Sequence, residues 1–183
     1  FASWNDGDTN ATRTIVMPLS NITYTATFTQ FVGSLIFYVA TNGSDAADGR
    51  SWPTAKQTLQ AAIDLTLDGD TVLVSNGVYA TGGRVVAGAL TNRVAITNAI
   101  TVSSVNGSGV TEIRGAWHPV TTNGDAAVRC AYVGTNAVLS GFTLTNGATR
   151  TTGETNGGGA WCEASGVLSN CTLTFNASAG VGG

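Results

Sequence analysis

The sequence predicts an all-β protein whose larger part is a parallel solenoid, and two observations support this prediction. The segments Val138–Thr145 and Val167–Thr174 agree at six of eight positions with an offset of 29 residues, a spacing that is typical of solenoid repeats. Ile100–Ser103 is an earlier and more divergent copy. Apart from one helical pattern, the chain offers only short strands between Gly and Asn turns, which excludes alternating βαβ units.

The composition favours the same fold class. Gly, Thr, Asn and Ser make up 79 of the 183 residues, and only 10% of the residues are charged, against about 25% in an ordinary domain. Such a chain favours strands and turns over helical bundles. A net charge of -3 without a basic cluster argues against a nucleic-acid partner, and an apolar share of 43% excludes a disordered polar linker.

The two ends of the chain indicate a piece of a longer protein. The sequence begins without Met or a signal peptide, and it stops inside a repeat. The longest apolar run, Phe31–Ala40, has about ten residues and is interrupted by Gly33 and Ser34. Because a membrane-spanning helix needs roughly 20 residues, we interpret this run as a buried strand and predict no membrane-spanning segment.

Residues 1–30 predict a small antiparallel β module. Apolar side chains alternate with threonines from Ile22 to Phe28, which is typical of a half-buried antiparallel strand. Asn5–Asp8 is a turn signal, and Arg13–Met17 is predicted as a second short strand. The Phe-x-x-Trp-x-Asp-Gly opening, the R-T-I-V-M strand and the T-A-T-F ending resemble the C-terminal part of an internalin-type B-repeat. That resemblance implies a stalk or spacer of a bacterial surface protein.

Residues 31–183 predict the solenoid and a helix that caps it. Phe37–Ala40 is the first strand, and a polar loop follows at Thr41–Gly49. The helix is expected at about 55–66 with Thr54 as its N-cap, and its apolar face consists of Leu59, Ala62, Ile63 and Thr66. The later strands are expected at Thr71–Ser75, Val78–Tyr79, Arg93–Ile96, Ile100–Val105, Val110–Ile113, Ala127–Val133, Val138–Thr145, Ala160–Glu163 and Val167–Phe175.

Equivalent residues of successive repeats are expected to stack. We place three pairs inside the coil: Leu139 with Leu168, Phe142 with Cys171, and Leu144 with Leu173. The dipeptides Ser140-Gly141 and Ser169-Asn170 are expected to bend the chain between two sheets. One outward sheet would then carry a ladder of hydroxyls, formed by Thr101, Ser103, Thr143, Thr145, Thr172 and Thr174. Such ladders occur on ice-binding faces, but Thr is a common strand residue, and we do not predict that function.

This larger part resembles right-handed parallel β-helix proteins of the pectate-lyase-like superfamily. More narrowly, it is similar to bacterial surface and secreted proteins with polymorphic-outer-membrane-protein-like repeats. The resemblance rests on Tyr38–Gly49, Ser51–Thr54, Leu59–Ile63, Asp68–Val74, Gly77–Tyr79, Leu139–Gly147, Gly157–Cys162 and Ser169–Leu173. It implies a right-handed coil whose N-terminal opening is covered by the helix.

The acidic residues near the helix are candidates for calcium, and we interpret them as turn formers. They are Asp45, Asp48, Asp64, Asp68 and Asp70. Their spacing matches neither an EF-hand nor a nonapeptide calcium repeat. With one histidine and no CxxC pair, a zinc site is not expected, and we predict no metal or cofactor.

Polysaccharide-cleaving enzymes with this fold need a basic residue or several carboxylates facing one groove. Beyond residue 85 the candidate acids are Glu112, Asp125, Glu154 and Glu163, and the candidate bases are Arg93, Arg114, Arg129 and Arg150. No two acids recur on one predicted strand, so we predict no catalytic residue in this segment. His118 is expected on the surface, and Trp117 and Trp161 are expected either to stack on sugars or to pack at an edge.

Three cysteines, Cys130, Cys162 and Cys171, leave at least one free thiol. We expect buried thiols, with a Cys130–Cys162 or Cys162–Cys171 disulfide as the alternative.

The function expected from these features is that of a non-catalytic segment of a bacterial extracellular or cell-surface β-helix protein. Its role would be adhesion, glycan contact or the building of a fibre or stalk. The alternative is the N-terminal part of a polysaccharide lyase or glycoside hydrolase whose active site lies mostly downstream. Expected partners are a polysaccharide, a host or neighbouring cell surface, or other copies of the chain through open coil ends.

Overall fold

The computed structural model describes residues 1–16, 18–28 and 33–182. These residues form two compact units, Phe1–Gly33 and Ser34–Gly183. The predicted boundary between residues 30 and 31 lies outside the described residues, as do Met17 and the first two residues of the predicted strand at 31–40.

The N-terminal unit contains one antiparallel strand pair. Strand β1 (Ser3–Trp4) pairs with β2 (Ala26–Thr27). Of the strand predicted at residues 22–28, only residues 26–27 therefore form a strand. The predicted strand at 13–17 is wrong over its described residues 13–16. Ile15 and Val16 are exposed there, and no described strand runs beside them to supply the backbone hydrogen bonds that a strand needs.

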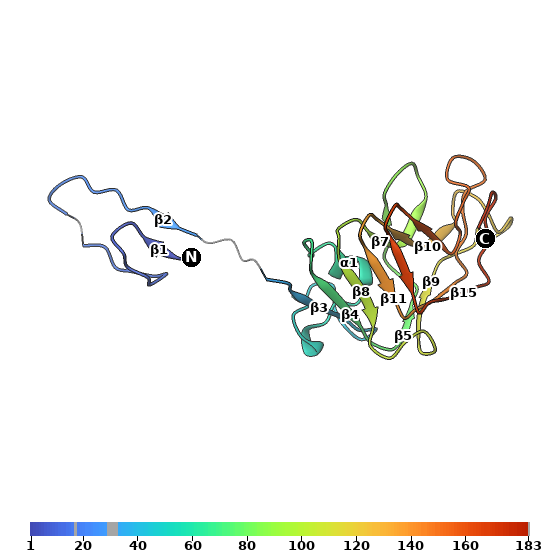
Figure 1. Ribbon diagram of the computed structural model, residues 1–183, viewed down its shortest axis with the longest axis horizontal. Coiled ribbons are helices and arrows are strands. Elements are labelled where there is room, and N and C mark those ends of the chain that lie inside the picture. The colour runs from blue at the N-terminus through green and yellow to red at the C-terminus, as the bar shows by residue number, and fades with distance from the viewer. Residues whose placement is uncertain (17, 29–32, 183) are drawn as a thin grey trace. The chain divides into compact units, whose positions relative to one another are not determined.

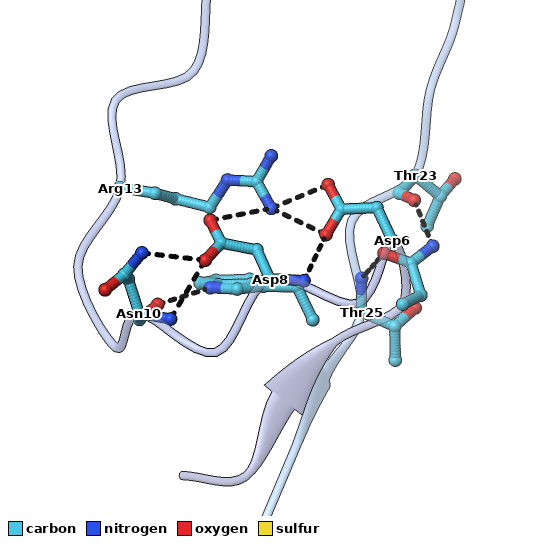
Figure 2. Close-up of polar contacts among 8 residues, drawn as sticks. Asp6, Asp8, Asn10, Arg13, Thr23 and Thr25 are labelled. Carbon is cyan, nitrogen blue, oxygen red and sulfur yellow. Dashed lines mark hydrogen bonds and ion pairs between the residues drawn. The ribbon is translucent and has the colours of Figure 1, made fainter.

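Polar contacts around Arg13 stabilise the segment at residues 13–16 (Figure 2). The guanidinium lies 2.8 Å from an Asp6 oxygen and 3.8 Å from an Asp8 oxygen, and its carbon lies 5.5 Å from the Trp4 ring and 4.8 Å from the Tyr24 ring. The hydrogen bond from Arg13 lowers the pKa of Asp6 below its ordinary value. Charge pairing and cation–π contacts therefore stabilise residues 13–16 in place of the strand predicted there.

The larger unit is a parallel β-solenoid of three sheets (Figure 1). The first sheet contains β3 (Ile36–Val39), β4 (Thr71–Val74), β8 (Thr101–Ser104), β11 (Val138–Ser140) and β14 (Val167–Ser169). The second contains β5 (Gly77–Tyr79), β9 (Thr111–Arg114), β12 (Thr143–Thr145) and β15 (Thr172–Thr174). The third contains β6 (Arg84–Val85), β7 (Thr91–Ile96), β10 (Val128–Val133) and β13 (Ala160–Cys162). Among the described residues, the strands paired in these three sheets run parallel, except that β6 pairs with β7 in the antiparallel direction.

The strand register confirms the repeat. Leu139 pairs with Leu168 in the first sheet, and Leu144 pairs with Leu173 in the second. The predicted strands Val138–Thr145 and Val167–Phe175 each contain two strands, separated by the predicted bend. The bends use left-handed backbone, with φ of 81° at Gly141 and 52° at Asn170, a region that Gly and Asn adopt most readily.

The inward ladder forms the core, with one exception at its end. Leu139, Phe142 and Leu144 are fully buried, and Leu168 and Cys171 pack against the core while partly buried. Leu173, predicted inside, is 50% exposed. It lies on β15, the outermost described strand of its sheet, so no further strand covers it there.

The helix is shorter than predicted. Helix α1 spans Leu59–Ile63, after a 3-10 turn η1 at Trp52–Thr54. The N-cap is Thr58, whose side chain accepts from Ala61 N, and not Thr54. The reason is that Lys56 pairs with β3: its N–H donates to Tyr38 O, and its carbonyl accepts from Ala40 N. Residues 55–56 therefore stay extended.

Helix α1 covers the open end of the third sheet, as the predicted cap requires. Leu59, Ala62 and Ile63 are buried in the core. The Gln60 side chain accepts from Ala95 N at 2.8 Å and donates to Ala95 O at 3.3 Å. The Gln60 side chain thereby forms hydrogen bonds with backbone groups of β7 that do not pair with β6. These bonds protect the exposed edge of the strand. Among the described residues, no helix is long and apolar enough to span a bilayer.

Candidate functional site

A cleft of about 240 Å³ lies on the outer face of the third sheet. Strand β10 separates it from the interior, because Cys130, Ala131 and Val133 belong to the core, whereas Arg129 and Tyr132 line the cleft. The remaining lining residues are Val86, Ala87, Asn92, Gly153, Glu154, Thr155, Asn156, Trp161 and Glu163. The cleft therefore combines a strand surface with two loops.

Two aromatic side chains and one carboxylate form the outer part of the cleft. Tyr132 and Trp161 are register partners on β10 and β13. The Trp161 indole N–H donates to Glu163 Oε1 at 2.9 Å, and the Tyr132 hydroxyl donates to the same oxygen at 3.0 Å. Burial and the Glu163 carboxylate raise the pKa of Tyr132 above its ordinary value, so the phenol stays a proton donor at neutral pH. Trp161 is held in place and is still 38% exposed.

Arg129 lies buried at the base of the cleft. Its guanidinium donates to Gly157 O at 2.8 Å, to Asn156 O at 2.8 Å and to Asn92 Oδ1 at 2.9 Å. Burial lowers the pKa of Arg129, but a guanidinium stays charged in proteins. These bonds fix the turn before β13.

Glu154 stabilises the loop that carries two further lining residues of the cleft, Val86 and Ala87. Its carboxylate accepts from the backbone N–H groups of Ala89 and Leu90, both at 3.1 Å, and lies 3.9 Å from Arg150. The segment that carries Val86 and Ala87 is thus tied to a loop more than sixty residues away. Gly88 has a φ of 61°, and a Cβ there would lie 2.5 Å from the Glu154 carboxyl carbon, so glycine permits this approach.

The structure brings together four of the predicted candidates: Arg129, Glu154, Trp161 and Glu163. The others lie elsewhere. Glu112 pairs with Arg114 at 2.6 Å and Asp125 with Arg150 at 2.7 Å, Arg93 donates to the carbonyls of Gly82 and Arg114, and Trp117 does not line the cleft. His118 sits in a turn, where its Nδ1 accepts from Thr121 N at 3.2 Å.

Sequence reasoning missed Tyr132, although the repeat contains the signal for it. Tyr132 and Trp161 are 29 residues apart, the offset of the repeat, and they are register partners. If the repeat is extended upstream from Val138 and Val167, Tyr132 and Trp161 fall at equivalent positions and stack on the outer face of the solenoid. No comparable signal exists for Asn92 or for the loop at 153–156.

The candidate calcium ligands accept hydrogen bonds from other groups of the protein. Asp45 accepts from Gln57 N and Thr58 N, and Asp70 accepts from Leu35 N and Leu67 N. Asp48, Asp64 and Asp68 likewise accept from Arg50 N, Gln60 Nε2 and Ala99 N, respectively. Within the described ranges, no group of three or more His, Cys, Asp or Glu side chains is placed to hold a metal ion.

The hydroxyl ladder is split between two sheets, so its prediction as one ladder is wrong. Thr101 pairs with Val138 in the first sheet. Thr143 pairs with Thr172 in the second, but its other neighbour is Glu112. The strand that contains Thr101 pairs with the first half of the later repeat, Val138–Ser140. It does not pair with the second half, Thr143–Thr145, which carries the T-x-T pattern.

The three cysteines are free thiols that differ in access. Burial raises the pKa of Cys130 to about 12, and it also raises the pKa of Cys162 above its ordinary value. The prediction of buried thiols is nevertheless wrong for Cys162, which is exposed to reagents. Because the thiolate is the reactive form, we expect an aromatic disulfide reagent at pH 8 to label Cys162 quickly and Cys130 only in denaturant. Mass mapping of the labelled peptides checks this, and rapid native labelling of Cys130 would contradict its position in the core.

Comparison with known proteins gives no family for the chain. No family model matches, and no curated protein matches. Among solved structures, a rhamnogalacturonan lyase matches 63% of this chain and 30% of its own length, with 20% identity and a TM-score of 0.47. A GH136 lacto-N-biosidase from Eubacterium ramulus matches 79% of this chain and 27% of its own length, with 16% identity and a TM-score of 0.49. The chain thus spans less than a third of either protein, and similarity this low does not bear on the activity of this chain.

Proposed function

We propose that this chain is a non-catalytic, glycan-binding segment of a bacterial extracellular or cell-surface β-helix protein. The observation that supports the proposal is the cleft on the third sheet, in which an exposed indole stands beside a hydrogen-bonded carboxylate. Saccharide rings present apolar C–H faces and polar hydroxyl edges, so a site for them needs both features.

The Trp161 side chain has the properties of a stacking platform. Its N–H is bonded to Glu163 and its ring lies 5.8 Å from the Arg129 guanidinium carbon. An aromatic ring that is fixed before binding loses little conformational entropy when a ligand stacks on it. The Glu163 carboxylate, of which Oε1 alone accepts protein hydrogen bonds among the described residues, then supplies an acceptor for a hydroxyl group.

The two cleft carboxylates support binding rather than cleavage. Glu154 accepts two backbone N–H groups, and Glu163 Oε1 accepts from Trp161 and Tyr132. Glycoside hydrolysis needs one carboxyl group as acid and another as base or nucleophile. We therefore favour glycan contact over the alternative of an enzyme whose catalytic groups lie partly in this segment.

The extracellular location rests on the sequence resemblances and on composition. Few charges and many Thr, Gly and Asn residues suit a long, neutral solenoid surface. The proposed roles are adhesion or a glycan-bound stalk, with stacking of coil ends between copies as a further means of assembly.

Replacing Trp161 with alanine is expected to weaken glycan binding at least tenfold, which corresponds to about 1.4 kcal/mol. A glycan array selects the ligand, and isothermal titration of the selected oligosaccharide measures the loss. Trp117→Ala is the matched control, because Trp117 is 45% exposed and lies outside the cleft.

Equal losses in both variants, or no binding to any glycan, would contradict the proposal. Release of new reducing ends from the selected polysaccharide by the wild-type chain would favour the enzyme.

A further inference from the structure

We propose that the cleft selects an uncharged sugar ring and rejects the corresponding uronic acid. This inference rests on the proposed function and adds the chemical class of the ligand. It follows from which charged groups in the cleft can reach a ligand and which cannot.

Arg129, the cation of the cleft, is not available to a carboxylate. It is buried, and its Nε, Nη1 and Nη2 each already donate to a protein acceptor. A bidentate Arg–carboxylate pair uses two parallel N–H groups. Arg129 is only 5% exposed, so a ligand carboxylate would have to open the packing around the two guanidinium N–H groups that remain. The bonds to Asn156 O and Asn92 Oδ1 would then be weakened or lost.

Glu163 is the charged group that a ligand meets. It is only partly buried, and its Oε1 already accepts two hydrogen bonds, whereas its Oε2 has no protein partner among the described residues. That oxygen can accept from a sugar hydroxyl. A uronate carboxylate in the same position would face a like charge and would lose its hydration without gaining a donor.

The other charges near the cleft do not reverse this preference. Glu154 is negative and lies 3.9 Å from Arg150, which also pairs with Asp125. The charges that a ligand meets in the cleft are therefore negative, and an uncharged sugar ring is not repelled by them, whereas a uronate is.

The volume of the cleft limits what enters it. At about 240 Å³, it is smaller than the roughly 300–1,000 Å³ of sites that enclose drug-sized ligands. It therefore accepts one ring of a chain, and the rest of the glycan lies outside.

The test compares neutral oligosaccharides and uronate oligosaccharides of the same linkage and length by isothermal titration. We expect the wild-type chain to bind the neutral member of the best pair at least tenfold more tightly. Glu163→Gln keeps an amide oxygen for Trp161 and Tyr132 but removes the charge, so the discrimination should fall at least threefold through a gain in uronate affinity. Glu112→Gln is the control, because Glu112 pairs with Arg114 on the second sheet and should leave the ratio unchanged. A thermal melt checks that each variant is folded.

The outcomes separate the two proposals. Equal or tighter uronate binding by the wild-type chain, still lost in Trp161→Ala, would overturn the selectivity and leave glycan binding intact. An unchanged ratio in folded Glu163→Gln would also overturn the role of that carboxylate. If neither member of any pair binds, glycan binding itself fails, and the selectivity fails with it.

Discussion

Replacing Phe142 with alanine is expected to lower the free energy of unfolding by about 3–5 kcal/mol. Phe142 is fully buried between β11 and β12 and belongs to the same core cluster as Leu139 and Leu144. Truncating it removes the apolar side chain and leaves a cavity that a rigid strand ladder refills poorly. Urea unfolding followed by circular dichroism measures the loss.

Phe175→Ala is the matched control, because Phe175 is 74% exposed. Its effect should stay within about 0.5 kcal/mol. If the two alanine variants were equally stable, the stacked interior of the repeat would be wrong.

Replacing Gln60 with leucine is expected to lower the free energy of unfolding by about 2–4 kcal/mol. The side-chain amide bonds both backbone groups of Ala95, and each buried polar group left without a partner costs about 1–3 kcal/mol. Leucine fills a similar volume but satisfies neither group. The same change should increase the hydrogen-exchange rate of the Ala95 amide.

Gln57→Leu serves as the control, since Gln57 is exposed and lies just before the N-cap of helix α1. Wild-type stability and unchanged exchange at Ala95 in Gln60→Leu would show that the helix does not close the edge of β7.

The repeat was sufficient to predict the parallel solenoid, its bends and the buried positions of Leu139, Phe142 and Leu144, because stacked coils place equivalent residues in register. The helix bounds were wrong because residues 55–56 pair with β3, a contact between segments that local helical periodicity does not record. The prediction of a strand at residues 13–17 was wrong over its described residues 13–16 for a related reason. A strand needs a partner, and the sequence pattern does not show whether one is present.

The cleft was predictable only in part. Trp161, Glu163, Arg129 and Glu154 were candidates for separate reasons, but their grouping depends on the third sheet and on two loops. Glu154 reaches Ala89 across 65 residues, and no local pattern encodes that contact. The column of Tyr132 and Trp161 was available from the repeat offset, which shows that a repeat can locate surface sites as well as cores.

The proposed binding mode, in which a sugar ring stacks on Trp161 in the cleft of the third sheet, is best checked by a crystal structure of the chain with the neutral oligosaccharide that binds most tightly. We expect one ring against the Trp161 indole, with a hydroxyl donating to Glu163. A ligand bound elsewhere on the solenoid, with Trp161 uncovered, would contradict the claim.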